Sequence, residues 1–150
     1  MEMTITSAAI ATLISGLTSS IITMLISNKN KERGLDAQLD EILKIAIKYP
    51  YLESENFTSG WKHDFDRNDE KYLRYDVYGT LIFNFLARVS HHCHYNKKKI
   101  DQYIAIEDWV KLHSLYWSDP TSIVENIDSY NKEFVQLINS FVTKRKKSTK

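Results

Sequence analysis

Five side chains that could do chemistry lie close together near the middle of the chain: Arg88, His91, His92, Cys93 and His94. Arg88 and His92 are four residues apart and would share one face of a helix. A histidine can move protons near neutral pH, and an arginine can stabilise the negative charge that develops on a phosphate. The plainer interpretation, which we favour, is a set of polar side chains that cap and solvate a helix end.

Arg88 and His94 are six residues apart, and this spacing resembles the R-x(4–6)-H motif of HEPN ribonucleases. The resemblance implies that His94 would act as acid and base while Arg88 stabilises the phosphate charge. HEPN proteins usually carry a polar residue after the arginine, whereas this chain has Val89, and their activity needs a dimer that pairs two motifs. A membrane-tethered HEPN-like ribonuclease is therefore the enzyme alternative. The leading expectation is a protein that is not an enzyme.

The same cluster has a spacing that could hold a metal ion. His91 and His94 could bind one together with Cys93 or with the distant His63 or His113. A structural zinc site normally has four ligands, often supplied by paired short motifs, and the chain has only one such cluster. We therefore expect no metal at these residues.

An acidic run imitates the start of a calcium-binding loop. It reads Asp64-x-Asp66-x-Asn68, but the position of the turn glycine is Asp69 and that of the bidentate glutamate is Tyr75. The sequence also lacks the glycine-rich motifs that bind nucleotides. We therefore expect no cofactor.

The composition limits which classes of protein and which partners are possible. The 150 residues fit about one domain, and 20 Lys+Arg against 19 Asp+Glu leave a net charge of +1. Nucleic acid is not an expected partner, because binding to phosphates draws on a surplus of cations. A hydrophobic content of 43% with only four glycines excludes a disordered chain. The single cysteine cannot form an internal disulfide.

An uncharged segment near the N-terminus predicts a membrane anchor at residues 1–27. No charged residue lies between Ile5 and Ile26, and a helix of that length spans about 33 Å, enough to cross a hydrocarbon core of about 30 Å. Lys29, Lys31 and Arg33 follow at once, and cations favour the cytoplasmic side. We expect a single-pass protein of the bacterial inner membrane with its N-terminus outside and its C-terminal domain in the cytoplasm. A soluble amphipathic helix and a cleaved secretory signal are the alternatives.

Small and hydroxyl residues in this segment recur every four positions in two adjacent rows. The rows are Ala8, Thr12, Gly16 and Ser20, and Ser7, Ala11, Ser15 and Ser19. We call these eight residues the small-residue stripe. Such stripes let helices approach closely in lipid, so the stripe predicts self-association into a homo-oligomer, and a water-lined pore is a further step. The alternative is that the hydroxyls bond to their own backbone and face lipid.

Apolar residues at helical spacing predict four helices after a polar neck at residues 28–34. They cover about residues 35–48, 69–95, 106–117 and 128–142, with Asp128 as a possible N-cap. Residues 51–68 are expected to form a loop whose Trp61, Phe57 and Phe65 pack back onto the helices. The fold class is therefore all-α, with one N-terminal transmembrane helix and a cytosolic irregular bundle of about four helices at residues 35–142.

A basic tail at residues 143–150 ends the chain. It contains Lys144, Arg145, Lys146 and Lys147. A solvated, disordered tail is one interpretation. Contact with anionic lipid or with phosphate is the other, because each cation near an anionic membrane contributes about 1 kcal/mol.

Several segments between residues 43 and 141 carry a resemblance to known proteins. They are Tyr49-Pro50-Tyr51-Leu52-Glu53, Trp61, Arg74-Tyr75-Asp76-Val77-Tyr78, Phe83-Asn84-Phe85-Leu86, Glu107-Asp108-Trp109-Val110-Lys111-Leu112-His113 and Trp117. The chain resembles small, membrane-anchored, all-helical bacterial proteins. Its layout is similar to transmembrane effectors of anti-phage systems, namely retron-encoded membrane effectors and the membrane accessory proteins of type VI CRISPR systems.

The resemblance implies an inner-membrane effector of anti-phage defence. Its cytosolic domain would sense a soluble protein or a ribonucleoprotein encoded nearby, and oligomerisation would permeabilise the membrane. A non-catalytic membrane scaffold for a soluble partner is the remaining alternative.

Overall fold

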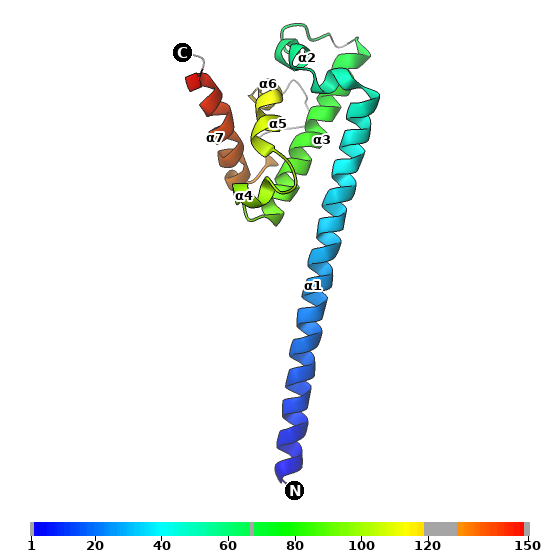
Figure 1. Cartoon of the computed structure of the whole chain (residues 1–150), viewed down its shortest axis with the longest axis vertical. Coiled ribbons are helices and arrows are strands. Elements are labelled where there is room, and N and C mark those ends of the chain that lie inside the picture. The colour runs from blue at the N-terminus through cyan, green and yellow to red at the C-terminus, as the bar shows by residue number, and fades with distance from the viewer. Residues whose placement is uncertain (1, 67, 119–128, 149–150) are drawn as a thin grey trace. The chain divides into compact units, whose positions relative to one another are not determined.

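The computed structural model describes residues 2–66, 68–118 and 129–148, and all regular structure in these ranges is helical (Figure 1). The side chains of residues 2–19, 21 and 144–148 are outside this description. The prediction of an all-α fold is confirmed. The expected helices were about five, one at the N-terminus and about four in the bundle, and the described residues form more: α1 (Glu2–Lys48), η1 (Pro50–Glu53), α2 (Glu55–Gly60), α3 (Glu70–His92), α4 (Lys97–Ile100), α5 (Ile106–Leu112), α6 (Ser114–Ser118) and α7 (Lys132–Ser148).

The chain divides into two compact units, residues 1–37 and 38–150, and helix α1 belongs to both. The predicted polar neck at residues 28–34 is therefore helical and not a break between two elements. Its lysines, glutamate and arginine are good helix formers, so a polar sequence without apolar periodicity still continues the helix. Among the described residues, no helix is both long enough and apolar enough to cross a membrane.

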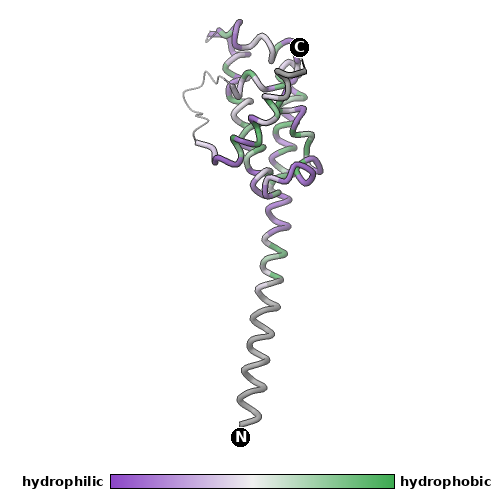
Figure 2. The backbone as a smooth tube through the Cα atoms, turned by 90° about the vertical axis from the view of Figure 1, so that its left-hand side faces the viewer, coloured by the Kyte–Doolittle hydropathy of each residue, from purple (hydrophilic) through white to green (hydrophobic). Residues whose placement is uncertain are grey.

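The first unit exposes a run of large apolar side chains at residues 22–26. Ile22, Met24, Leu25 and Ile26 are each 56–66% exposed. Figure 2 shows this hydrophobic stretch of α1 followed by the hydrophilic turns of the neck. The apolar side chains of this stretch therefore lie outside any core.

In the second unit, Pro50 ends α1 and begins η1. A proline disfavours a helical conformation in the residue before it, and it is well tolerated in the first turn of a new helix. The predicted loop 51–68 is wrong in part, because η1 and the short helix α2 occupy its first half. The predicted packing of its aromatic residues is confirmed: Trp61 is fully buried against Tyr75, and Phe57 stacks on Tyr72.

Helix α3 is the central helix of the second unit, close to the predicted range 69–95. Asp69 caps its N-terminus by accepting a hydrogen bond from the backbone N–H of Lys71. One face of α3 is buried and carries both Tyr75 and Ile82. Helices α4, α6 and α7 all pack against α3.

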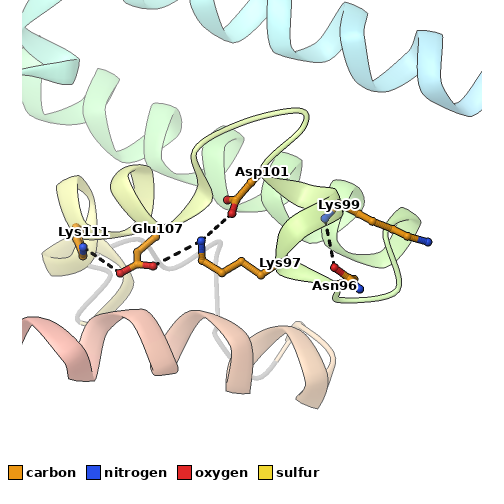
Figure 3. A network of polar contacts seen from close by, with 6 residues as sticks. All are labelled: Asn96, Lys97, Lys99, Asp101, Glu107 and Lys111. Atoms are coloured by element: carbon orange, nitrogen blue, oxygen red, sulfur yellow. Dashed lines mark hydrogen bonds and ion pairs between the residues drawn. The ribbon is translucent and has the colours of Figure 1, made fainter.

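The predicted helix at residues 106–117 is divided in two at His113, which is the C-cap of α5. A network of charged side chains joins α4 to α5 (Figure 3). The ammonium of Lys97 lies 2.7 Å from Asp101 and 3.7 Å from Glu107, and Lys111 lies 3.0 Å from the same glutamate. These pairs are partly exposed, so they contribute little to the free energy of unfolding and mainly orient the two short helices.

Helix α7 closes the bundle by packing on α5 and α3. The predicted N-cap Asp128 lies outside the described residues, and in the structure Asn131 accepts a hydrogen bond from the backbone N–H of Phe134. Phe134, Ile138 and Phe141 are buried, as their spacing predicts. The backbone of α7 is helical to Ser148, which includes most of the predicted basic tail.

Candidate functional site

Four polar side chains from separate elements meet in the core of the second unit. Glu53 ends η1, Tyr75 and Tyr78 are on the buried face of α3, and His113 is the residue between α5 and α6. We call these four residues the Glu53–His113 network. His113 and Tyr75 are fully buried, and Glu53 keeps 26% of its side chain exposed. The network is thus a polar site inside an apolar core with one member at its edge.

The hydrogen bonds of the network assign a tautomer to His113. Nδ1 of His113 lies 2.9 Å from the Tyr75 hydroxyl, and Nε2 lies 3.4 Å from Oε1 of Glu53. The second distance is too long for a good hydrogen bond, and among the described residues Nε2 has no other hydrogen-bond partner. A neutral imidazole with its proton on Nε2 suits both neighbours, because Tyr75 then donates to Nδ1 and the N–H dipole faces the carboxylate.

The two phenols of the network stay protonated. Burial first, and then the nearby carboxylate of Glu53, raise the pKa of Tyr75 and Tyr78 far above the ordinary value. The Tyr78 hydroxyl donates a 2.5 Å hydrogen bond to Oε1 of Glu53. The phenols of Tyr75 and Tyr78 are neutral, the imidazole of His113 is buried, and the carboxylate of Glu53 accepts a hydrogen bond from Tyr78. The network therefore contains no free nucleophile. Its hydrogen bonds join η1 to α3 through Glu53 and Tyr78, and α3 to the end of α5 through Tyr75 and His113, so the network fixes the relative positions of these elements.

An arginine and two tyrosines lie beside the network. The guanidinium of Arg74 donates to the Tyr51 hydroxyl at 2.8 Å, pairs with Glu70, and stacks 3.9 Å from the centroid of the Tyr49 ring. Such a cation over an aromatic face is worth about 0.5–1 kcal/mol where it is partly exposed. Arg74 thereby holds Tyr49 and Tyr51, at the start of η1, against α3.

The predicted pair Arg88 and His94 is not placed on one helix face. Arg88 is exposed on α3, whereas His94 follows the helix with a positive φ of 51°. Within the described part of the chain, neither side chain has a hydrogen bond or an ion pair. His91 is also exposed, while Cys93 beside it is buried. The cluster is therefore spread over a helix end, with its side chains at different depths.

The residues considered for metal binding are used in other ways. Asp66 accepts a hydrogen bond from the backbone N–H of Asn68, Asp69 caps α3, and Asp64 contacts His63. Among the residues described, no three His, Cys, Asp or Glu side chains gather as a metal site.

Most of the small-residue stripe lies outside the described side chains. Only Ser20 is described, and it is exposed on α1. Ser7, Ala8, Ala11, Thr12, Ser15, Gly16 and Ser19 are on the helical backbone of α1, and nothing is described of their side chains. The same holds for Lys144, Arg145, Lys146 and Lys147 on α7.

Comparison of the chain with protein-family models, with curated protein sequences and with solved structures finds no match.

Sequence reasoning missed the Glu53–His113 network, although each member lies in a segment singled out for its resemblance. The available signal was the pair Tyr75 and Tyr78, three residues apart on a face predicted to be buried. A buried tyrosine hydroxyl needs a hydrogen-bond partner, so two of them predict polar groups on the elements that cover the face. Nothing local identifies those partners as Glu53 and His113.

Proposed function

We propose that this protein is a membrane-anchored effector of anti-phage defence in the bacterial inner membrane, and that it acts without catalysis. Its uncharged segment from Ile5 to Ile26 spans the bilayer, and its helical domain binds a soluble protein or ribonucleoprotein in the cytoplasm. Self-association of the spans through the small-residue stripe permeabilises the membrane.

The exposed run at residues 22–26 carries the membrane part of the proposal. Ile22, Met24, Leu25 and Ile26 expose more than half of their side chains on a helix. Contiguous exposed apolar side chains mark a surface that is covered by lipid or by protein. The exposed cations Lys29, Lys31 and Arg33 follow this run, as expected of the cytoplasmic end of a span.

The helical domain supports a binding role more than a catalytic one. In the Glu53–His113 network, Tyr75 is hydrogen-bonded to His113 and Tyr78 to Glu53, and His113 has no exposed surface. Arg88 is exposed on α3, and His94 follows the helix with a positive φ of 51°.

The stripe is tested by substitutions that replace its small residues with leucine. We expect cells that overexpress the intact chain to take up a membrane-impermeant dye and to stop growing. The double substitution Gly16→Leu and Ser20→Leu should abolish both effects, while the protein stays in the membrane fraction. Thr6→Leu is the matched control, because at about 100° per residue position 6 falls on the side of the helix away from the two rows. Toxicity that survives the double substitution would show that the stripe does not act in this way.

The ribonuclease alternative is separated by its own variant. His94→Ala leaves dye entry unchanged if the effector is non-catalytic. If instead this variant abolishes growth arrest and spares cellular RNA, the protein is an enzyme and the proposal is wrong.

A further inference from the structure

The segment that forms the second half of α3 and all of α4 is basic and contains no acidic residue. Residues 77–100 hold Arg88, Lys97, Lys98 and Lys99 together with three of the five histidines, and all 19 Asp and Glu residues of the chain lie elsewhere. The whole chain has a net charge of only +1. This segment is therefore far more basic than the chain as a whole.

One of the four Lys and Arg side chains of this segment is paired within the unit, and three are not. The ammonium of Lys97 is turned toward Asp101 and Glu107, whereas the Lys99 side chain extends away from both carboxylates (Figure 3). The three cations that we call the basic corner are Arg88, Lys98 and Lys99. Their side chains are exposed, and none has a hydrogen bond or an ion pair within the ranges that the structure describes. The basic corner is therefore available to an anionic partner.

The elements next to the basic corner do not neutralise it. The start of α7 is joined to the corner by the hydrogen bond between Asn131 and Tyr95, and there the exposed Lys132 and Glu133 offset each other. On α3, the carboxylate nearest in sequence is that of Asp76, about three turns before the corner. The corner therefore keeps its positive charge in the folded unit.

The basic corner lies toward the end of the second unit at which α1 enters it. Helix α3 starts near the end of α1, where Arg74 stacks on the Tyr49 ring, and it runs back toward Gln38 (Figure 1). The part of α1 in this unit covers only residues 38–48, whereas α3 has 23 residues. The C-terminal end of α3 therefore returns to the side of the unit from which the N-terminal segment leaves.

This position matters if the uncharged segment up to Ile26 spans a membrane. Only residues 27–37 then separate the second unit from the bilayer, and a helix of that length is about 17 Å long. So short a connection keeps the basic corner at a high local concentration near the cytoplasmic leaflet. That leaflet has a negative surface, and each cation beside it strengthens binding by about fivefold. A weak site of three cations is therefore enough to hold the domain there.

We propose that the basic corner binds the phosphates of anionic phospholipids, so that the helical domain lies against the cytoplasmic leaflet. The inference rests on the proposed function, since the span supplies the local concentration. Single-stranded nucleic acid offers the same phosphates, but its binding draws on exposed aromatic faces as well. The rings of Tyr95 and Tyr103 beside the corner are only partly exposed and already contact His91 and His92. Lipid therefore suits the corner better.

Energy transfer from tryptophan to a dansyl-labelled lipid headgroup measures how close the domain lies to the bilayer. Trp61, Trp109 and Trp117 all belong to the second unit, so the signal reports on the domain. The full-length chain is reconstituted in vesicles of phosphatidylcholine, or of phosphatidylcholine mixed with phosphatidylglycerol. We expect the transfer to be about twofold more efficient in the anionic vesicles, because the corner draws the domain onto their surface.

Two triple variants of equal net charge test the site. The first removes the basic corner, and it should lose the increase in anionic vesicles: Arg88→Gln, Lys98→Gln and Lys99→Gln. The second removes three exposed lysines near the opposite end of the unit, and it should keep the increase: Lys44→Gln, Lys48→Gln and Lys71→Gln. The wavelength of tryptophan emission reports whether each variant is folded.

The possible failures can be told apart. A chain that enters neutral vesicles but shows equal transfer in both kinds of vesicle overturns this inference alone, as does a folded corner variant that keeps the increase. A chain that is not retained by neutral vesicles contradicts the proposed function and this inference with it. If phosphatidylglycerol has no effect and the corner variant instead loses binding to a labelled oligouridylate, the corner is a nucleic-acid site and the proposal is wrong.

Discussion

The Tyr75 hydroxyl lies 2.9 Å from Nδ1 of His113, and these two residues are 38 positions apart in the sequence. Both side chains are fully buried, so this bond is made without competition from water. It ties the central helix α3 to the junction between α5 and α6, where the expected single helix is interrupted. The conformation of that junction and the orientation of Tyr75 are therefore fixed together.

Replacement of His113 by alanine should lower the free energy of unfolding by roughly 2–4 kcal/mol, because it opens a cavity and leaves the Tyr75 hydroxyl without its partner. Urea unfolding of the full-length chain in detergent, followed by tryptophan fluorescence, measures the change in the second unit. His63→Ala is the matched control, since His63 is almost fully exposed and should change the value by less than about 0.5 kcal/mol. Equal stability of the two variants would contradict the structural role of the network.

The stability of the second unit should fall in alkaline solution. Tyr75 and Tyr78 have a pKa in the folded state that is raised above the value of about 10 for an unfolded chain. The folded state then holds protons that the unfolded state releases, so their contribution is complete below pH about 10 and is lost as the pH rises further. Each tyrosine adds up to about 1.4 kcal/mol per pH unit. Urea unfolding at several pH values between about 9 and 11 measures this slope, and Tyr75→Phe should make it shallower.

Gly79→Ala should destabilise the protein although alanine is the better helix former. A Cβ atom at this position would lie 2.8 Å from carbons of the Tyr116 ring. That ring is buried and its hydroxyl lies 2.7 Å from Thr80, so it has little freedom to move. We expect a net loss of about 1–3 kcal/mol, measured by thermal unfolding.

Gly34→Ala is the comparison for that substitution. No atom lies within 4 Å of a Cβ built at Gly34. This change should raise the helical signal in circular dichroism, with a gain of up to about 1 kcal/mol. If both glycine variants behave alike, the close approach of α3 to Tyr116 is wrong.

The thiol of Cys93 should react slowly with an aromatic disulfide reagent at neutral pH and rapidly in denaturant. The side chain is buried at the end of α3, and this burial raises the pKa of the thiol although Lys99 opposes the shift. Both effects reduce the amount of accessible thiolate, which is the reactive form. Rapid reaction of the folded protein would mean that this helix end opens readily.

The sequence predicted long periodic elements better than short ones. Helix α3 has enough turns for its apolar spacing to be seen, and Asp69 marks its start. By contrast, η1 and α2 are too short to show a period, so the segment after Pro50 was expected to be a loop. The neck at residues 28–34 shows no apolar period and yet continues α1, because residues that favour a helix need no apolar face to continue one that has already formed.

The candidate site could be predicted only in part. The sequence showed that Tyr75 and Tyr78 would be buried, because they share a face with Ile82. Their partners Glu53 and His113 are brought together by tertiary packing, which local patterns do not encode. The cluster around Arg88 was visible because its members are neighbours in sequence, yet the structure gives them different depths and directions.

The corner between α3 and α4 is built without glycine, although two successive residues, His94 and Tyr95, have φ values of 51° and 56°. For an L-amino acid, this left-handed conformation costs about 1–2 kcal/mol. A backbone hydrogen bond of 2.8 Å from the Tyr95 N–H to the Ser90 carbonyl closes the turn. The corner therefore stores backbone strain in two residues that have a Cβ atom. A glycine in place of His94 would remove the strain at that residue and make the native state harder to unfold.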